Sequence, residues 1–124
     1  MPIIDIELVE DEQSGQGTTI NIQALADSLG VLFNSGQAGT WVRLRHLPRD
    51  RYAENQTRID QSTRPVFITV LKSRLGDENE LAVEAKAIAS TVSGLLDRPV
   101  QNTHVLFAPD AAGRIAFGGE LVRS

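Results

Sequence analysis

Two stretches of the chain repeat one order of patterns, a strand, a helix and a second strand, at an offset of about sixty residues. In the first stretch, residues 3–9 alternate between two faces as a strand does, and apolar residues then recur every three or four positions through a helix expected over about 20–34. A strand from Thr40 completes the unit. Because such crossover connections are right-handed and join parallel strands, the two strands of each unit are expected to lie parallel.

The second stretch repeats this order with a strand over 66–72, a helix over about 77–96 and a closing strand from Thr103. Asp77 followed by Glu80 has the pattern of a capping box, which marks the start of a helix. The buried stripe of this helix is expected to consist of apolar residues at helical spacing: Leu81, Ala85, Ile88, Val92 and Leu95.

These patterns predict a single α+β domain over residues 1–124, built from two tandem β-α-β units over about 1–62 and 63–124. The units are expected to form a four-stranded mixed sheet with two helices on one face, and a short hairpin at Gly118–Gly119 closes the chain. One layer of helices leaves the other face of the sheet without a cover from this chain. We therefore expect an oligomer that covers it.

Composition narrows the classes of function. The formal net charge is -4 and the basic residues are scattered, which argues against nucleic acid as a partner. The chain has no cysteine, and His46 and His104 are far apart, so we expect neither a metal site nor a cofactor, and His104 is interpreted as a core or interface residue. With neither a signal-peptide pattern nor an apolar run of roughly 20 residues, the sequence favours a cytoplasmic protein that does not bind membranes.

Four segments carry a family resemblance: the start PIIDIELV, the strand motif VRL, the motif VLKSR and the ending GRIAFGGELV. In these segments the chain resembles the tautomerase superfamily, specifically the longer chains that look like two copies of 4-oxalocrotonate tautomerase in tandem. Macrophage migration inhibitory factor is a more distant resemblance, because its Cys-X-X-Cys feature has no counterpart here. The resemblance implies a homotrimer whose sheets face inward, with an active site around each amino-terminal proline.

The resemblance implies that Pro2 is the catalytic base once Met1 has been removed. A terminal proline is a secondary amine, and burial or nearby cations can lower its pKa from the usual 7.7 to 8.0, roughly, until much of it is unprotonated near neutrality. Such an amine can take a proton from an enol oxygen and return it elsewhere on the conjugated system. If Met1 is retained, the Pro2 nitrogen is a tertiary amide without basicity.

By local matching to the short tautomerases, Arg74 and Arg43 are the cations that the resemblance implies beside the base. The two residues come from different halves of the chain. At the point of the first half that corresponds to Arg74, the chain has Glu12 instead. The proline at the start of the second half, Pro65, lies inside the chain and has no free amine, so only Pro2 can act as an amine base.

Five further residues are expected to contact the substrate: Arg45, Tyr52, Glu54, Ile115 and Phe117. The first three belong to the segment RLRHLPRDRYAENQ, which offers polar side chains after the second strand. Ile115 matches the aromatic residue that the short enzymes carry near the carboxyl terminus, and Phe117 follows two positions later. Trp41 is interpreted as a packing residue.

Three functions follow from these residues. The first is a cofactor-independent tautomerase (isomerase) that moves a proton in small 2-hydroxy-dienoate or enol-pyruvate type carboxylic acids, with arginines binding the carboxylate and carbonyl. The second is a hydratase, dehalogenase or decarboxylase of the same architecture, in which protonated Pro2 acts as the acid and a carboxylate such as Glu54 activates water. The third is a non-catalytic trimeric binding protein that keeps the fold.

Overall fold

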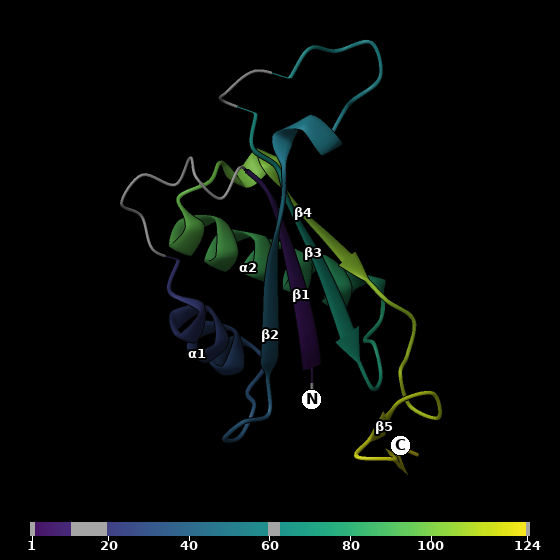
Figure 1. Ribbon diagram of the computed structural model, residues 1–124. Coiled ribbons are helices and arrows are strands. Elements are labelled where there is room, and N and C mark those ends of the chain that lie inside the picture. The colour runs from purple at the N-terminus through teal and green to yellow at the C-terminus, as the bar shows by residue number, and fades with distance from the viewer. Residues whose placement is uncertain (1, 11–19, 60–62, 124) are drawn as a thin grey trace.

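The computed structural model describes residues 2–10, 20–59 and 63–123. Met1, Glu12 and the expected boundary between the two units near residue 62 lie outside the described residues. Figure 1 shows two strand–helix–strand units followed by a small C-terminal hairpin. The strands and α-helices are β1 (Pro2–Val9), α1 (Ile22–Leu32), β2 (Trp41–Leu47), β3 (Val66–Lys72), α2 (Glu78–Leu96), β4 (Thr103–Phe107), β5 (Ala116–Phe117) and β6 (Glu120–Leu121), with short 3-10 turns at Arg49–Arg51 and Val100–Asn102.

The main sheet has the strand order β2-β1-β3-β4. Strands β1 and β2 pair in parallel, as do β3 and β4, whereas β1 and β3 are antiparallel. Both helices lie on one side of this sheet (Figure 1), so the expected α+β architecture is confirmed. Antiparallel pairing brings Pro2 opposite Lys72 at one end of the sheet, while the Val9 amide donates to the Pro65 carbonyl (3.1 Å) at the other. These are called the Pro2 end and the Pro65 end below.

The hydrophobic core lies between the sheet and the two helices. Its residues are each no more than 1% exposed: Ile4, Ile6, Leu8, Leu25, Leu29, Val66, Ile68, Val70, Ile88 and Val92. Each large aliphatic side chain buried in this way contributes roughly 1.5–3 kcal/mol. Because strand side chains alternate between faces, burial of the even-numbered residues of β1 directs Asp5 and Glu7 to the face away from the helices.

Helix α1 is shorter at both ends than the expected span of about 20–34. It begins after Asn21, whose side chain accepts a hydrogen bond from the Ala24 amide (3.0 Å) and so satisfies one of the free donors of the first turn. It ends before Asn34, which adopts the left-handed conformation that stops a helix. Side-chain capping and a left-handed residue, rather than apolar spacing, therefore set the bounds.

Helix α2 confirms the predicted capping box. Asp77 accepts from the Glu80 amide (2.8 Å), and the Glu80 side chain accepts from the Asp77 amide (3.1 Å). The prediction that Leu95 belongs to the buried stripe is wrong, because Leu95 is 47% exposed and Leu96 packs against the core instead. Both lie at helical spacing from Val92, so the last turn could not be assigned from spacing alone.

The open face is the side of the sheet turned away from the helices. Across β1 and β2 it carries two pairs of opposite charge, Asp5 with Arg43 and Glu7 with Arg45. Across β3 and β4 it carries mainly apolar and aromatic side chains, of which Leu106 is 65% exposed. The expected apolar surface therefore lies mainly over β3 and β4, and Trp41, which is 50% exposed, adds to it at the start of β2. Within the described ranges, no helix has the combined length and apolar character needed to cross a membrane.

Candidate active site

Pro2 is buried at the first position of β1, between the ends of two neighbouring strands. On one side, β3 places Lys72 opposite Pro2. On the other side, β2 places Trp41 opposite Ile3, the next residue of β1. The Pro2 nitrogen, which is the first atom of this central strand, therefore lies at one end of the sheet, with β2 and β3 on either side.

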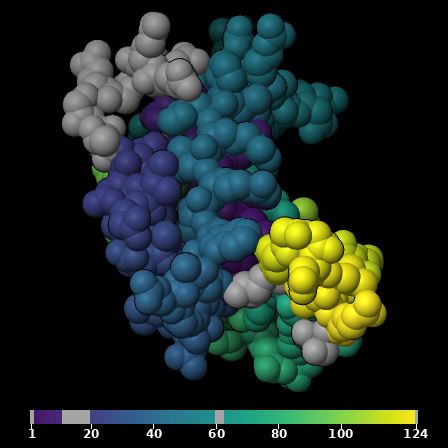
Figure 2. All heavy atoms as spheres, turned by 60° about the horizontal axis from the view of Figure 1, so that its bottom comes forward, coloured from purple at the N-terminus to yellow at the C-terminus, as the bar shows by residue number. Residues whose placement is uncertain are grey.

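The C-terminal segment passes the end of β1. It first follows β3, since the Ala112 amide donates to the Ser73 carbonyl (3.1 Å). It then reaches β2, where the Phe117 ring meets the Trp41 ring edge-on, with centroids 5.1 Å apart and planes at 77°. Because β1 lies between β3 and β2, the segment crosses beside Pro2, and Figure 2 shows the C-terminal hairpin in yellow at this end of the molecule.

The expected terminal hairpin is confirmed and positions two sequence-predicted residues. Ile115 is half-buried and its carbonyl accepts from the Val122 amide (2.8 Å), while Phe117 pairs with Glu120. The two-residue turn between the short strands consists of Gly118 and Gly119, both at positive φ (58° and 87°). Glycine adopts this conformation without the steric cost that an L side chain incurs, so the turn returns the chain within two residues.

Two basic residues lie at the Pro2 end on the side of β3. The ammonium of Lys72 lies 3.1 and 3.2 Å from the two carboxylate oxygens of Glu84 and 5.4 Å from the centre of the Phe33 ring. Its charge is thus balanced within the subunit. Arg74, two residues further along, is exposed, and among the described residues it has no ion-pair or hydrogen-bond partner.

Arg43 and Arg45 lie on the open face and have carboxylate partners of their own. The Arg43 guanidinium donates two hydrogen bonds to Asp5 (2.6 and 2.9 Å), which raises the pKa of Arg43 above its usual range. Arg45 lies 3.7 Å from Glu7. Since Arg43 is on β2 and Arg74 follows β3, the two predicted arginines lie on different sides of β1 within one subunit.

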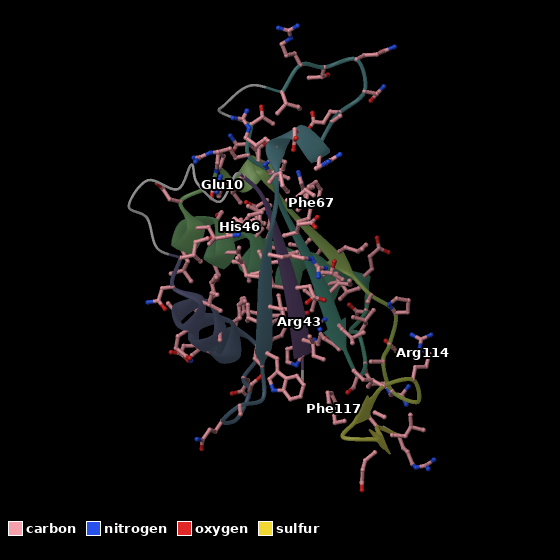
Figure 3. All side chains as sticks on the ribbon, viewed as in Figure 1. Glu10, Arg43, His46, Phe67, Arg114 and Phe117 are labelled. Atoms are coloured by element: carbon pink, nitrogen blue, oxygen red, sulfur yellow. The ribbon has the colours of Figure 1, made fainter. Side chains whose placement is uncertain are left out.

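Tyr52 and Glu54 follow the far end of β2, at the opposite end of the sheet from Pro2. The Tyr52 hydroxyl donates to a Glu54 carboxylate oxygen at 2.6 Å, and this bond, with partial burial, raises the pKa of Tyr52 to about 12. The Tyr52 ring lies 5.8 Å from that of Phe67 on the open face. In Figure 3, Phe67, the ring neighbour of Tyr52, is labelled toward one end of the sheet, and Phe117 is labelled beyond the other end.

The Pro65 end contains a buried ion pair that sequence reasoning missed. Arg98, whose side chain is 5% exposed, lies 2.7 Å from Glu10, and Arg64 lies 3.7 Å from the same carboxylate oxygen. Glu10 opens an acidic run that reads as a solvated loop, and Arg98 follows the end of a helix. No local pattern marks either residue as buried, because the pair joins segments far apart in the sequence.

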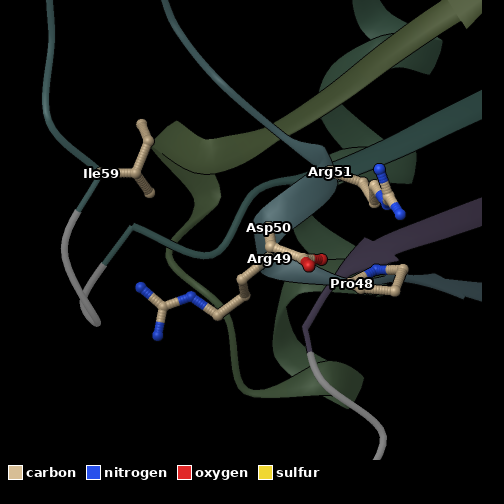
Figure 4. Close-up of a pocket in the computed structure, with 5 residues that line it drawn as sticks. All are labelled: Pro48, Arg49, Asp50, Arg51 and Ile59. Carbon is tan, nitrogen blue, oxygen red and sulfur yellow. The ribbon is translucent and has the colours of Figure 1, made fainter.

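A hollow of about 710 Å³ lies at the Pro65 end, lined by the turn after β2 and by the loop that follows (Figure 4). Its lining residues are Pro48, Arg49, Asp50, Arg51 and Ile59. This hollow lies at the opposite end of the sheet from Pro2. The candidate active site is therefore defined by Pro2 and the side chains around it, and the hollow is not part of it. In the part of the chain that the structure describes, His, Asp and Glu side chains form no group of three or more suited to a metal ion.

No family model and no curated protein matches this chain. Solved structures, in contrast, match its fold over almost its whole length. A fused 4-OT, F6, solved as an asymmetric trimer, superposes with a TM-score of 0.73 at 17% identity, covering 98% of this chain and 96% of its own. Macrophage migration inhibitory factor from Oncomelania hupensis gives 0.71 at 19% identity over 98% and 82% of the two chains.

A third structure, Pt0534 inactivated by 2-oxo-3-pentynoate, has a TM-score of 0.70 at 16% identity and covers 98% of this chain and 95% of its own. The chain therefore has the fold shared by 4-OT and macrophage migration inhibitory factor, which is the tautomerase-superfamily fold. Within that class it is similar to the fused 4-OT proteins along nearly its full length. The resemblance stated from sequence is thus confirmed at the level of the fold.

Proposed function

We propose that this protein is a cofactor-independent tautomerase that moves a proton in small 2-hydroxy-dienoate or enol-pyruvate type carboxylic acids. The observation that carries the proposal is the position of Pro2, which is buried at the end of the central strand β1 beside the C-terminal segment. Burial disfavours a charged amine, so the buried position of Pro2 supports a terminal amine that acts as a base. Likeness in fold to 4-OT proteins supports the same chemistry.

In the proposed reaction, the Pro2 nitrogen takes the proton of an enol hydroxyl. The O–H bonding electrons form the carbonyl, and the carbon–carbon double bond takes a proton from the resulting pyrrolidinium, so one proton moves from oxygen to carbon. Arg74 binds the substrate carboxylate through its planar guanidinium, which suits two parallel hydrogen bonds. Ile115 and Phe117 form the apolar wall.

We further propose a homotrimer in which the open faces are turned inward. The uncovered apolar surface of the open face supports this assembly, as does the trimeric state of the fused 4-OT structure F6. Tyr52 and Glu54 lie too far along the sheet to reach Pro2 of their own subunit. In the proposed trimer we assign Tyr52 and Glu54 to the active site of a neighbouring subunit. We assign Arg43 and Arg45 to the same site, where each keeps its carboxylate partner, Asp5 or Glu7.

The test is the rate at which purified protein ketonises phenylenolpyruvate, measured for the natural chain and for Pro2→Ala after intact mass has established that Met1 is absent from both. Alanine leaves a primary amine, so we expect a loss of at least about tenfold, or roughly 1.4 kcal/mol of transition-state stabilisation. A Met1-free protein that is inactive, or whose rate is indifferent to Pro2, overturns the proposed base.

The hydrogen bond between Tyr52 and Glu54 favours a second candidate, a hydratase, dehalogenase or decarboxylase. There the Glu54 carboxylate would activate water and protonated Pro2 would act as the acid. Turnover of haloacrylates or malonate semialdehyde, in place of enol ketonisation, would identify it. Binding of substrate analogues without any dependence on the Pro2 nitrogen would instead identify a non-catalytic binding protein.

A further inference from the structure

We draw no further inference here: the strongest candidate, the hollow beside the turn Arg49–Arg51 at the Pro65 end, carries nothing, because the buried guanidinium of Arg98 is held by Glu10 and neither of these two is among the described residues that line the hollow.

Discussion

The two ends of the sheet give opposite surroundings to two similarly placed prolines. Pro2 opens β1 next to an exposed arginine and a half-exposed tryptophan. Pro65 directly precedes β3 at the other end and is fully buried near the ion pair of Glu10 and Arg98. Similar strand–helix–strand units can therefore place a buried proline either beside exposed side chains or beside a buried ion pair.

The difference has a covalent origin. The Pro65 nitrogen belongs to a peptide bond inside the chain, so no change in its surroundings can make it a base. The Pro2 nitrogen becomes an amine when Met1 is removed. Charges are accordingly buried close to Pro65, whereas the proposed function requires room for a substrate beside Pro2. Two pairs of variants and one single variant test this contrast between the two ends of the sheet.

The largest expected effect is on stability at the Pro65 end. Arg98→Met should lower the free energy of unfolding by about 3–5 kcal/mol, because it leaves the Glu10 carboxylate buried without its nearest counterion. Urea denaturation at one fixed protein concentration measures the change. The matched control is Arg74→Met at the Pro2 end, where an exposed side chain should change stability by less than about 0.5 kcal/mol. Equal losses for the two arginines would contradict the contrast.

The second effect separates activity from stability at the two prolines. Pro2→Ala should reduce kcat/KM for enol ketonisation at least about tenfold per folded molecule, roughly 1.4 kcal/mol. Pro65→Ala should reverse the pattern, with full activity per folded molecule and a loss of about 0.5–3 kcal/mol in stability from the buried site. Steady-state kinetics and urea denaturation of both variants measure the two effects. A large loss of kcat/KM in Pro65→Ala would contradict the prediction that Pro65 contributes to stability alone.

The smallest effect is a titration at the Pro65 end. Tyr52 is the only tyrosine of the chain, so tyrosinate absorbance reports its pKa directly, and we expect a midpoint of about 12. Glu54→Gln should move the midpoint toward the ordinary value of about 10, because the carboxylate that disfavours a second negative charge is gone. An unchanged midpoint would mean that Glu54 does not control Tyr52.

The sign of the linked stability follows from this raised pKa. The folded state holds the Tyr52 proton more tightly than the unfolded chain, so the contribution of the hydrogen bond is complete below about pH 10. It is lost as pH rises from there through about 12. Near neutral pH, Tyr52 remains a neutral donor to Glu54.

Much of the fold could be predicted because the patterns that specify it are local. Alternation of apolar residues in β1 and β3 and the capping box of Asp77 fix elements within a few neighbouring residues. Where two leucines both fit the helical spacing, as Leu95 and Leu96 do, only packing decided which is buried. The antiparallel pairing of β1 with β3, which sets the two ends apart, has no local signal.

The candidate site was predictable only in part. The family resemblance led to Pro2, Arg74 and Phe117, and the structure places all three at one end of the sheet. The separation of Tyr52 from Pro2 follows from strand direction, since a connector after a strand parallel to β1 must lie at the far end. Trp41 was interpreted as packing, because the sequence does not show whether an aromatic residue on a strand is covered.

Trp41 is also the only tryptophan in the chain. Its indole is fixed by the Ala38 carbonyl and lies beside the strand that begins with Pro2. Fluorescence excited at wavelengths that tryptophan absorbs and tyrosine does not consequently originates at one location in the subunit, next to the candidate site. The molecule carries its own optical probe, through which ligand occupancy at the Pro2 end can be followed without any label.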